Sequence, residues 1–142
     1  MTIYLDTSAA VKLYALEQGS EETRREIAVN RPVVSSLLTY AETRAALARK
    51  YRSREIVATA FETGKAEFEL DWRAFVKMPP DSAIVRRAAD LAEEFRLRAY
   101  DAIHLATAER LFHEIQSEVR FACFDTALNR AASILGLTSV MR

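Results

Sequence analysis

Short apolar runs alternate with longer segments of helical periodicity along this chain. The apolar runs predict strands at residues 3–5, 33–35, 75–78, 120–124 and 138–140. The segments between them predict helices at residues 9–16, 21–29, 37–51, 54–72, 82–95 and 100–116, and a last helix that follows Asp125 and ends at Gly136. Strands that alternate with helices favour a parallel sheet covered on both faces. We therefore predict an α/β fold, a three-layer α/β/α sandwich with a central parallel β-sheet, formed by one domain over residues 1–142.

The composition agrees with such a domain and indicates the cellular compartment in which to expect it. Of the residues, 50% are hydrophobic and 28% are charged, with only 3 Gly and 3 Pro, which is typical of a compact, helix-rich protein. The single cysteine, Cys123, excludes an internal disulfide and favours a reducing compartment. The sequence shows no secretory signal and no apolar run near the ~18 residues that span a bilayer. We therefore expect a cytoplasmic protein with no membrane partner.

The charges balance, with 20 basic and 20 acidic residues. A chain with no net charge does not coat nucleic acid by charge alone. A nucleic-acid partner stays possible if bound cations neutralise the acids or if basic residues gather on one rim. One predicted helix end does carry a basic run, which is either a solvated face or a guide for RNA phosphates: Arg44, Arg49, Lys50, Arg52 and Arg54.

Four acidic residues stand out by their position in the predicted elements. Asp6 directly follows the first strand, and Asp125 directly follows the strand that contains Phe121 to Phe124. Glu42 lies early in the helix after the second strand, and Asp101 opens the helix at residues 100–116. Strand ends and the starts of the following helices lie at one edge of a parallel sandwich, which is the edge where ligands bind. The four carboxylates can therefore converge.

Helical spacing supports an inward direction for Asp101. It falls on the same stripe as Leu105, Ala108, Phe112 and Ile115. An ionised carboxylate on that side needs a partner, because a buried unpaired charge is costly. A hard divalent cation such as Mg²⁺, which takes oxygen ligands, would supply one.

Each acid also has a purely structural interpretation. Asp6 and Asp125 can be plain N-caps at a strand-to-helix turn, and Asp101 can be a first-turn acid favoured by the helix dipole. Glu42 can complete a capping box with Thr39. Each interpretation explains one residue, but four such acids at one sheet edge are harder to explain by capping alone.

The sequence of the helix that carries Glu42 argues against the capping box with Thr39. Its first residues already have helical character, so Ser36 is a better candidate for the cap than Thr39. Its small side chains would let it lie close against the sheet, along a predicted inward stripe of Leu38, Ala41, Ala45 and Ala48.

The four acids stand within segments that together resemble the PIN domain. The segments are Leu5-Asp6-Thr7-Ser8-Ala9, Glu42 within its small-residue helix, Tyr100-Asp101-Ala102-Ile103-His104-Leu105-Ala106-Thr107-Ala108, and Phe124-Asp125-Thr126-Ala127-Leu128 with Ala131-Ala132. They follow one another in order and cover essentially the whole chain. The resemblance is closest to the VapC-type toxins of prokaryotic toxin–antitoxin pairs.

This resemblance implies a specific site and activity. The acids would form the metal site of the family, with the hydroxyls of Ser8 and Thr7 beside it: Asp6, Glu42, Asp101 and Asp125. The family cleaves single-stranded or loop RNA with Mg²⁺ or Mn²⁺. It usually acts as a homodimer that a cognate antitoxin protein silences. The resemblance therefore implies a metal-dependent endoribonuclease with RNA and an antitoxin as partners.

Two other functions remain as alternatives. A receiver-like phosphoacceptor shares the parallel sheet and acidic pocket, but it requires paired acids after the first strand and a late lysine, which neither Leu5-Asp6-Thr7 nor Phe124-Asp125-Thr126 provides. A non-catalytic binding module would keep the fold alone. Among the remaining candidates, His104 can orient Asp101 or touch substrate but better suits a packing role, and Cys123 suits the core.

Overall fold

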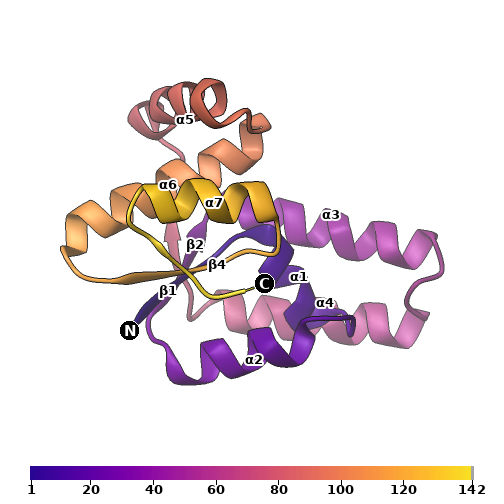
Figure 1. The fold of residues 1–142 in the computed structure, drawn as a ribbon. Helices are drawn as coiled ribbons and strands as arrows, with labels where there is room; N and C mark the ends of the chain where they lie inside the picture. Colours follow the sequence, from indigo (N-terminus) through magenta and orange to yellow (C-terminus); the bar gives the residue numbers. More distant parts are fainter. Residues whose placement is uncertain (142) are drawn as a thin grey trace.

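The computed structural model describes residues 1–141 and has the predicted layered arrangement (Figure 1). Its elements follow in the order β1 (Thr2–Leu5), α1 (Thr7–Tyr14), α2 (Ser20–Val29), β2 (Val33–Ser36), α3 (Leu38–Arg52), α4 (Ala58–Trp72), β3 (Val76–Met78), α5 (Ser82–Phe95), α6 (Ala99–Ile115), β4 (Val119–Ala122), α7 (Thr126–Ile134) and β5 (Thr138–Ser139). The strands form one sheet in the order β3-β2-β1-β4-β5, and every neighbouring pair is parallel. The predicted α/β sandwich is confirmed.

Helices cover both faces of the sheet. The helices α5, α6 and α7 lie on one face, and α1 to α4 lie on the other (Figure 1). Alternation along β1 divides the core between these layers: Tyr4 packs with the first set, whereas Ile3 and Leu5 pack with the second. This division explains why the strand is apolar at every position.

The inward stripe predicted for α3 is wrong. Ala41 and Ala45 are exposed, and the helix instead buries Thr39, Thr43, Ala46 and Leu47. Thr39 can be buried at little cost because its hydroxyl accepts a hydrogen bond from Ser35 Oγ at 2.7 Å. Alanine has too little apolar surface to determine which side of a helix faces inward.

The helix predicted to start at Arg54 begins only at Ala58, because Arg54 takes a left-handed backbone conformation with φ 62°. Gly64 lies at the middle of α4, where the sequence indicates a weak point of the helix. In the structure a Cβ at this position would lie 2.4 Å from the carbonyl oxygen of Tyr14. Gly64 therefore permits the close contact between α4 and α1.

No helix within residues 1–141 has both the length and the apolar character that crossing a membrane requires.

Candidate active site

A pocket of about 450 Å³ lies at the carboxyl-terminal edge of the sheet, where β1 and β4 end. The chain adds β2 and β3 on one side of β1 and then β4 and β5 on the other, so the strand order changes direction at this edge. Ligands of open α/β sheets bind at such a switch point. All four predicted acids line the pocket, together with the hydroxyl-bearing residues Thr7 and Ser8: Asp6, Glu42, Asp101 and Asp125. The convergence expected from the topology is present.

Asp6 follows β1 and is almost completely buried, with 4% of its surface exposed. Its Oδ1 accepts hydrogen bonds from Ser8 Oγ at 2.6 Å and from the backbone N–H of Ala9 at 3.2 Å, so it caps α1. Burial raises the pKa of the Asp6 carboxyl above its ordinary value, although the charge of His104 and the bond from Ser8 act in the opposite direction. The capping role and the place in the pocket therefore occur together.

Asp125 follows β4 and repeats this arrangement on the neighbouring strand. Its Oδ1 accepts from the backbone N–H of Leu128 at 2.8 Å and caps α7. Ser8 connects the two strand ends, because its Oγ donates to Asp6 and accepts from the backbone N–H of Phe124 at 3.0 Å. Both caps use the Oδ1 atom of the aspartate.

Glu42 on α3 is held by side chains alone. Its Oε1 accepts from Thr7 Oγ1 at 2.8 Å and lies 2.8 Å from His104 Nε2. The capping box with Thr39 does not form, and Ser36 Oγ instead accepts from the backbone N–H of Leu38 at 3.1 Å. Burial alone would raise the pKa of Glu42, but the hydrogen bonds and charge from His104 and the bond from Thr7 lower it below its ordinary value.

Asp101 lies in the first turn of α6, with 14% of its side chain exposed, as the inward stripe predicts. Its partner is a side chain of the protein: Arg98 Nε donates to Asp101 Oδ2 at 3.1 Å. Arg98, which also lines the pocket, therefore supplies part of the positive charge that the Asp101 carboxylate needs.

The carboxylates line the pocket without closing around a common point. Within residues 1–141, no three His, Cys, Asp or Glu side chains are close enough together to coordinate one metal ion directly. Mg²⁺ keeps several of its waters and binds through few carboxylates plus substrate phosphates, so a wide pocket lined by oxygen donors suits it. The chemistry of the donor set thus fits a hard, hydrated divalent ion.

Three basic side chains of the pocket were not assigned to the site from sequence: Arg49, Arg98 and His104. The Nε2 atom of His104 contacts Glu42 and not Asp101, and the side chain is buried with 1% exposed. It stands three residues after Asp101, which was the one sequence signal for it.

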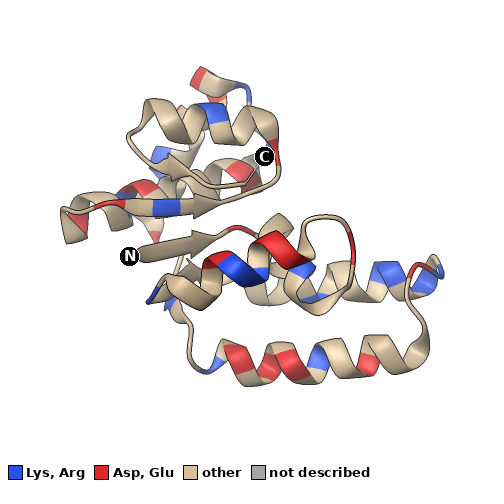
Figure 2. Cartoon of the chain, turned by 60° about the horizontal axis from the view of Figure 1, so that its bottom comes forward, with Lys and Arg blue, Asp and Glu red and all other residues tan. Residues whose placement is uncertain are grey.

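The basic run near the end of α3 separates into different roles. Figure 2 shows positive residues at that helix end and mainly acidic residues along α4. Arg44 pairs with Glu69, and Lys50 pairs with Glu17 and Glu55. Only Arg49 of the run lines the pocket.

Comparisons with known proteins agree with this architecture. The family model described as "PIN domain" matches residues 3–133. The chain is 36% identical to Ribonuclease VapC46 of Mycobacterium tuberculosis over 138 residues, which is 97% of this chain and 95% of that protein.

Two solved structures share the fold. A toxin-antitoxin complex from Klebsiella pneumoniae contains a chain with a TM-score of 0.68 and 22% identity, covering 96% of both chains. VapBC2 from Rickettsia felis, solved bound to a DNA fragment from its promoter, gives a TM-score of 0.66 at 11% identity and covers 100% of this chain and 98% of the other.

Proposed function

We propose, from the premise that this chain belongs to the PIN domain family and to its VapC-type members, that it is a toxin ribonuclease that hydrolyses RNA with the help of Mg²⁺ or Mn²⁺. The observation that carries the proposal is that four carboxylates, two from strand-to-helix turns and two from the helices α3 and α6, line one pocket at the switch point of the sheet. The name of the M. tuberculosis relative, a ribonuclease, supports the substrate class.

Water is the attacking group in this proposal, because the protein offers no activated nucleophile at the pocket. Cys123 is buried, and burial raises the pKa of its thiol above its ordinary value, so it is not a thiolate at neutral pH. The Ser8 oxygen accepts a hydrogen bond from the backbone N–H of Phe124 while its hydroxyl donates to Asp6, so it is held in the turn between the two strand ends. A bound divalent ion would lower the pKa of a water molecule and neutralise charge on the phosphate.

The residues of the chain have separate tasks in this scheme. Asp6, Asp101, Glu42 and Asp125 are the proposed catalytic and metal-binding acids. Ser8 and Thr7 fix the rotamers of Asp6 and Glu42 through their hydroxyl groups. Arg49 and Arg98 place positive charge at the pocket rim, where a phosphodiester would enter.

The direct test is cleavage of RNA by the purified protein with Mg²⁺, with Mn²⁺ and with EDTA. We expect cleavage with either metal and none in EDTA. Asp101→Asn should lower the rate by at least about 100-fold, the upper end of the loss seen when a partner of a metal ligand is removed. Its circular dichroism spectrum should stay unchanged.

Asp90→Asn is the matched control, because Asp90 is exposed on α5 outside the pocket. Full activity of Asp101→Asn would remove Asp101 from the site. A wild-type protein that cleaves no RNA even with Mn²⁺ would favour the alternative of a binding module.

The proposal includes partners: the RNA substrate in the cytoplasm, a second copy of the chain, and a cognate antitoxin. The two structural neighbours are from toxin–antitoxin systems, which supports an antitoxin here. We expect the neighbouring reading frame to encode a small protein that co-purifies with this chain and inhibits cleavage. A chain that is harmless when expressed alone would contradict this.

A further inference from the structure

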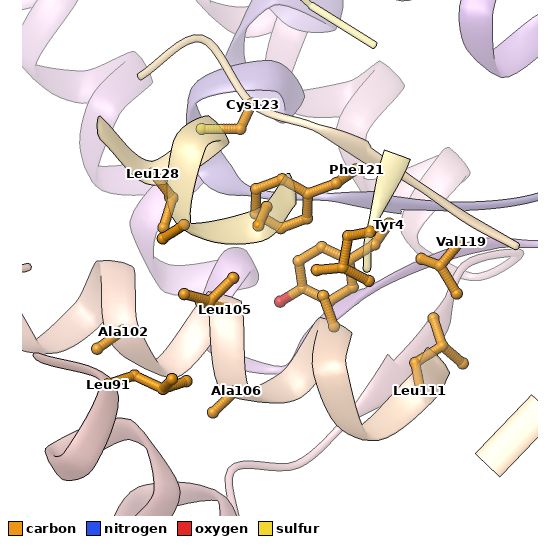
Figure 3. Close-up of a cluster of buried hydrophobic side chains, with 14 of the residues drawn as sticks. Tyr4, Leu91, Ala102, Leu105, Ala106, Leu111, Val119, Phe121, Cys123 and Leu128 are labelled. Atoms are coloured by element: carbon orange, nitrogen blue, oxygen red, sulfur yellow. The ribbon is translucent and has the colours of Figure 1, made fainter. Parts of the chain in front are cut away.

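A chain of hydrogen bonds runs from the hydrophobic core to the pocket. It begins at Tyr4, in the middle of β1, which is completely buried and stacks on Phe121 with ring centroids 5.8 Å apart. The Tyr4 hydroxyl is 2.7 Å from His104 Nδ1, and His104 Nε2 is 2.8 Å from Glu42 Oε1. Figure 3 shows the Tyr4 ring within the core cluster, with its oxygen directed toward α6, the helix that carries His104.

The acceptor at the end of the chain determines the direction of its bonds. An ionised carboxylate only accepts, so His104 Nε2 must carry the hydrogen that it shares with Glu42. If the ring is neutral, Nδ1 is then an acceptor and the Tyr4 hydroxyl donates to it; if both ring nitrogens carry a hydrogen, Nδ1 donates to the Tyr4 oxygen. Thr7 Oγ1 also donates to Glu42 Oε1, so two donors meet on the same carboxylate oxygen.

These hydrogen bonds connect Glu42 to residues that flank Asp6 at the end of β1. Tyr4 lies two residues before Asp6 on the central strand, and Thr7 directly follows Asp6. Glu42 comes from α3, and none of its hydrogen bonds described above is to the backbone. Its place relative to Asp6 therefore depends on Thr7 and His104, whose Oγ1 and Nε2 atoms also lie 3.2 Å apart, and through His104 on Tyr4.

We propose that Tyr4 and His104 are positioning residues that act through Glu42: they hold Oε1, direct the other oxygen toward the pocket and fix the distance from Glu42 to Asp6. The expected effect on metal affinity rests on the proposed function. Partners of this kind affect metal affinity although they do not touch the ion.

The first experiment measures Mn²⁺ affinity by electron paramagnetic resonance in a double-mutant cycle. We expect His104→Phe to weaken Mn²⁺ binding about 10–100-fold, and Tyr4→Phe to weaken it toward the lower end of that range. In a Glu42→Gln background both losses should nearly vanish, because the residue through which they act is gone. His113→Asn, which changes the other histidine, is the matched control and should bind as the wild type does.

Equal losses in the wild-type and Glu42→Gln backgrounds would overturn the proposal, since His104 would then act by another route. If His104→Phe does not fold, Tyr4→Phe decides the cycle, because it removes a single hydroxyl from a residue that remains aromatic and buried.

The second experiment needs neither metal nor activity. Long-range ¹H–¹⁵N spectra of the metal-free protein should show a hydrogen on His104 Nε2 and a shift of that nitrogen in Glu42→Gln. A neutral ring protonated on Nδ1 would overturn the proposal. A wild-type protein that neither binds Mn²⁺ nor cleaves RNA would contradict the proposed function, while these spectra would still decide whether His104 holds Glu42.

Discussion

The pocket holds two pairs of acids that the protein fixes in different ways. Asp6 and Asp125 follow strands, and backbone N–H groups of the next helix bind their Oδ1 atoms. Glu42 and Asp101 lie within helices, and side chains bind them: Thr7 and His104 in one case and Arg98 in the other. The first pair is defined by local chain geometry, whereas the second depends on which side chains the fold brings near.

Burial acts on Asp6 and Glu42 with different results. Asp6 is almost completely buried, and burial raises its pKa although Ser8 and the backbone N–H of Ala9 donate to its Oδ1, so its charge is unfavourable without a cation. Glu42 has two donors on one oxygen, and its pKa is lowered despite burial. Asp6 therefore gains more from a bound cation than Glu42, whose charge the protein already stabilises.

The largest expected effect is on RNA cleavage by the strand-end pair. Asp6→Asn and Asp125→Asn should each lower the rate by at least about 100-fold without losing the helix cap, because Asn is as good an N-cap as Asp. The alanine variants should lose about 1 kcal/mol of stability in addition, as a missing cap does. Cleavage assays and thermal melts measure both effects.

Asp81→Asn is the matched control for this pair. Asp81 caps α5 through the backbone N–H of Ile84 at 2.9 Å, as Asp6 and Asp125 cap their helices, but it does not line the pocket. It should cleave RNA as the wild type does. Undiminished cleavage by Asp6→Asn or Asp125→Asn would reduce these acids to caps.

A smaller effect should appear in thermal melts with and without metal. Saturating Mn²⁺, at a hundredfold excess over its dissociation constant, should stabilise the wild type by about 2.7 kcal/mol and both Asn variants less. In EDTA, the free energy of unfolding of Asp6→Asn should exceed that of the wild type by about 1 kcal/mol, and its melting temperature should be higher. The substitution removes repulsion among the carboxylates and still caps α1.

One pair of results would contradict the metal site. If Asp6→Asn is destabilised in EDTA and Mn²⁺ changes the melting temperature of no protein, then capping accounts for the acids and the metal site is wrong.

The smallest effect is the most discriminating, because Asp6 and Glu42 should respond to pH with opposite signs. The raised pKa of Asp6 gives a contribution to stability that is present below its unfolded pKa of about 3.9 and is lost as pH rises through the folded value. The lowered pKa of Glu42 gives a contribution that is present above its unfolded pKa of about 4.3 and is lost as pH falls through the folded value.

Melting temperatures in EDTA between about pH 3 and about pH 7 test this contrast. With rising pH, Asp6→Asn should gain on the wild type and Glu42→Gln should fall behind it. Differences of the same sign for both variants would show that the two acids are not held in different ways.

The sequence was sufficient for the strand-end pair and insufficient for the partners of the helix pair. An apolar run that stops at Asp6 or Asp125 places the acid at a strand end and at a cap, and both features follow from neighbouring residues. The bond between His104 and Glu42 joins residues 62 positions apart, so no local pattern indicates it. Arg98 was missed as a partner of Asp101, although it lies three residues before it on the helix.

The same limit explains the wrong face predicted for α3 and the tertiary role of Gly64, which the sequence does not indicate. The buried face of α3 includes Thr39, whose hydroxyl is bonded to Ser35 of β2, a contact that the pattern of alanines does not indicate. The meaning of Gly64 depends on the backbone of Tyr14, which approaches it from another helix. In both cases the deciding contact is tertiary, whereas periodicity reports only which residues share a face.

The double use of Asp6 and Asp125 as cap and pocket acid also bears on how such a gene can decay. One base substitution converts an Asp codon into an Asn codon, and the product keeps its helix cap. It would therefore fold and display an unchanged outer surface while cutting no RNA. Where the active protein harms the cell that makes it, such an inactive copy offers a mild escape. It would persist as a decoy that still takes up antitoxin.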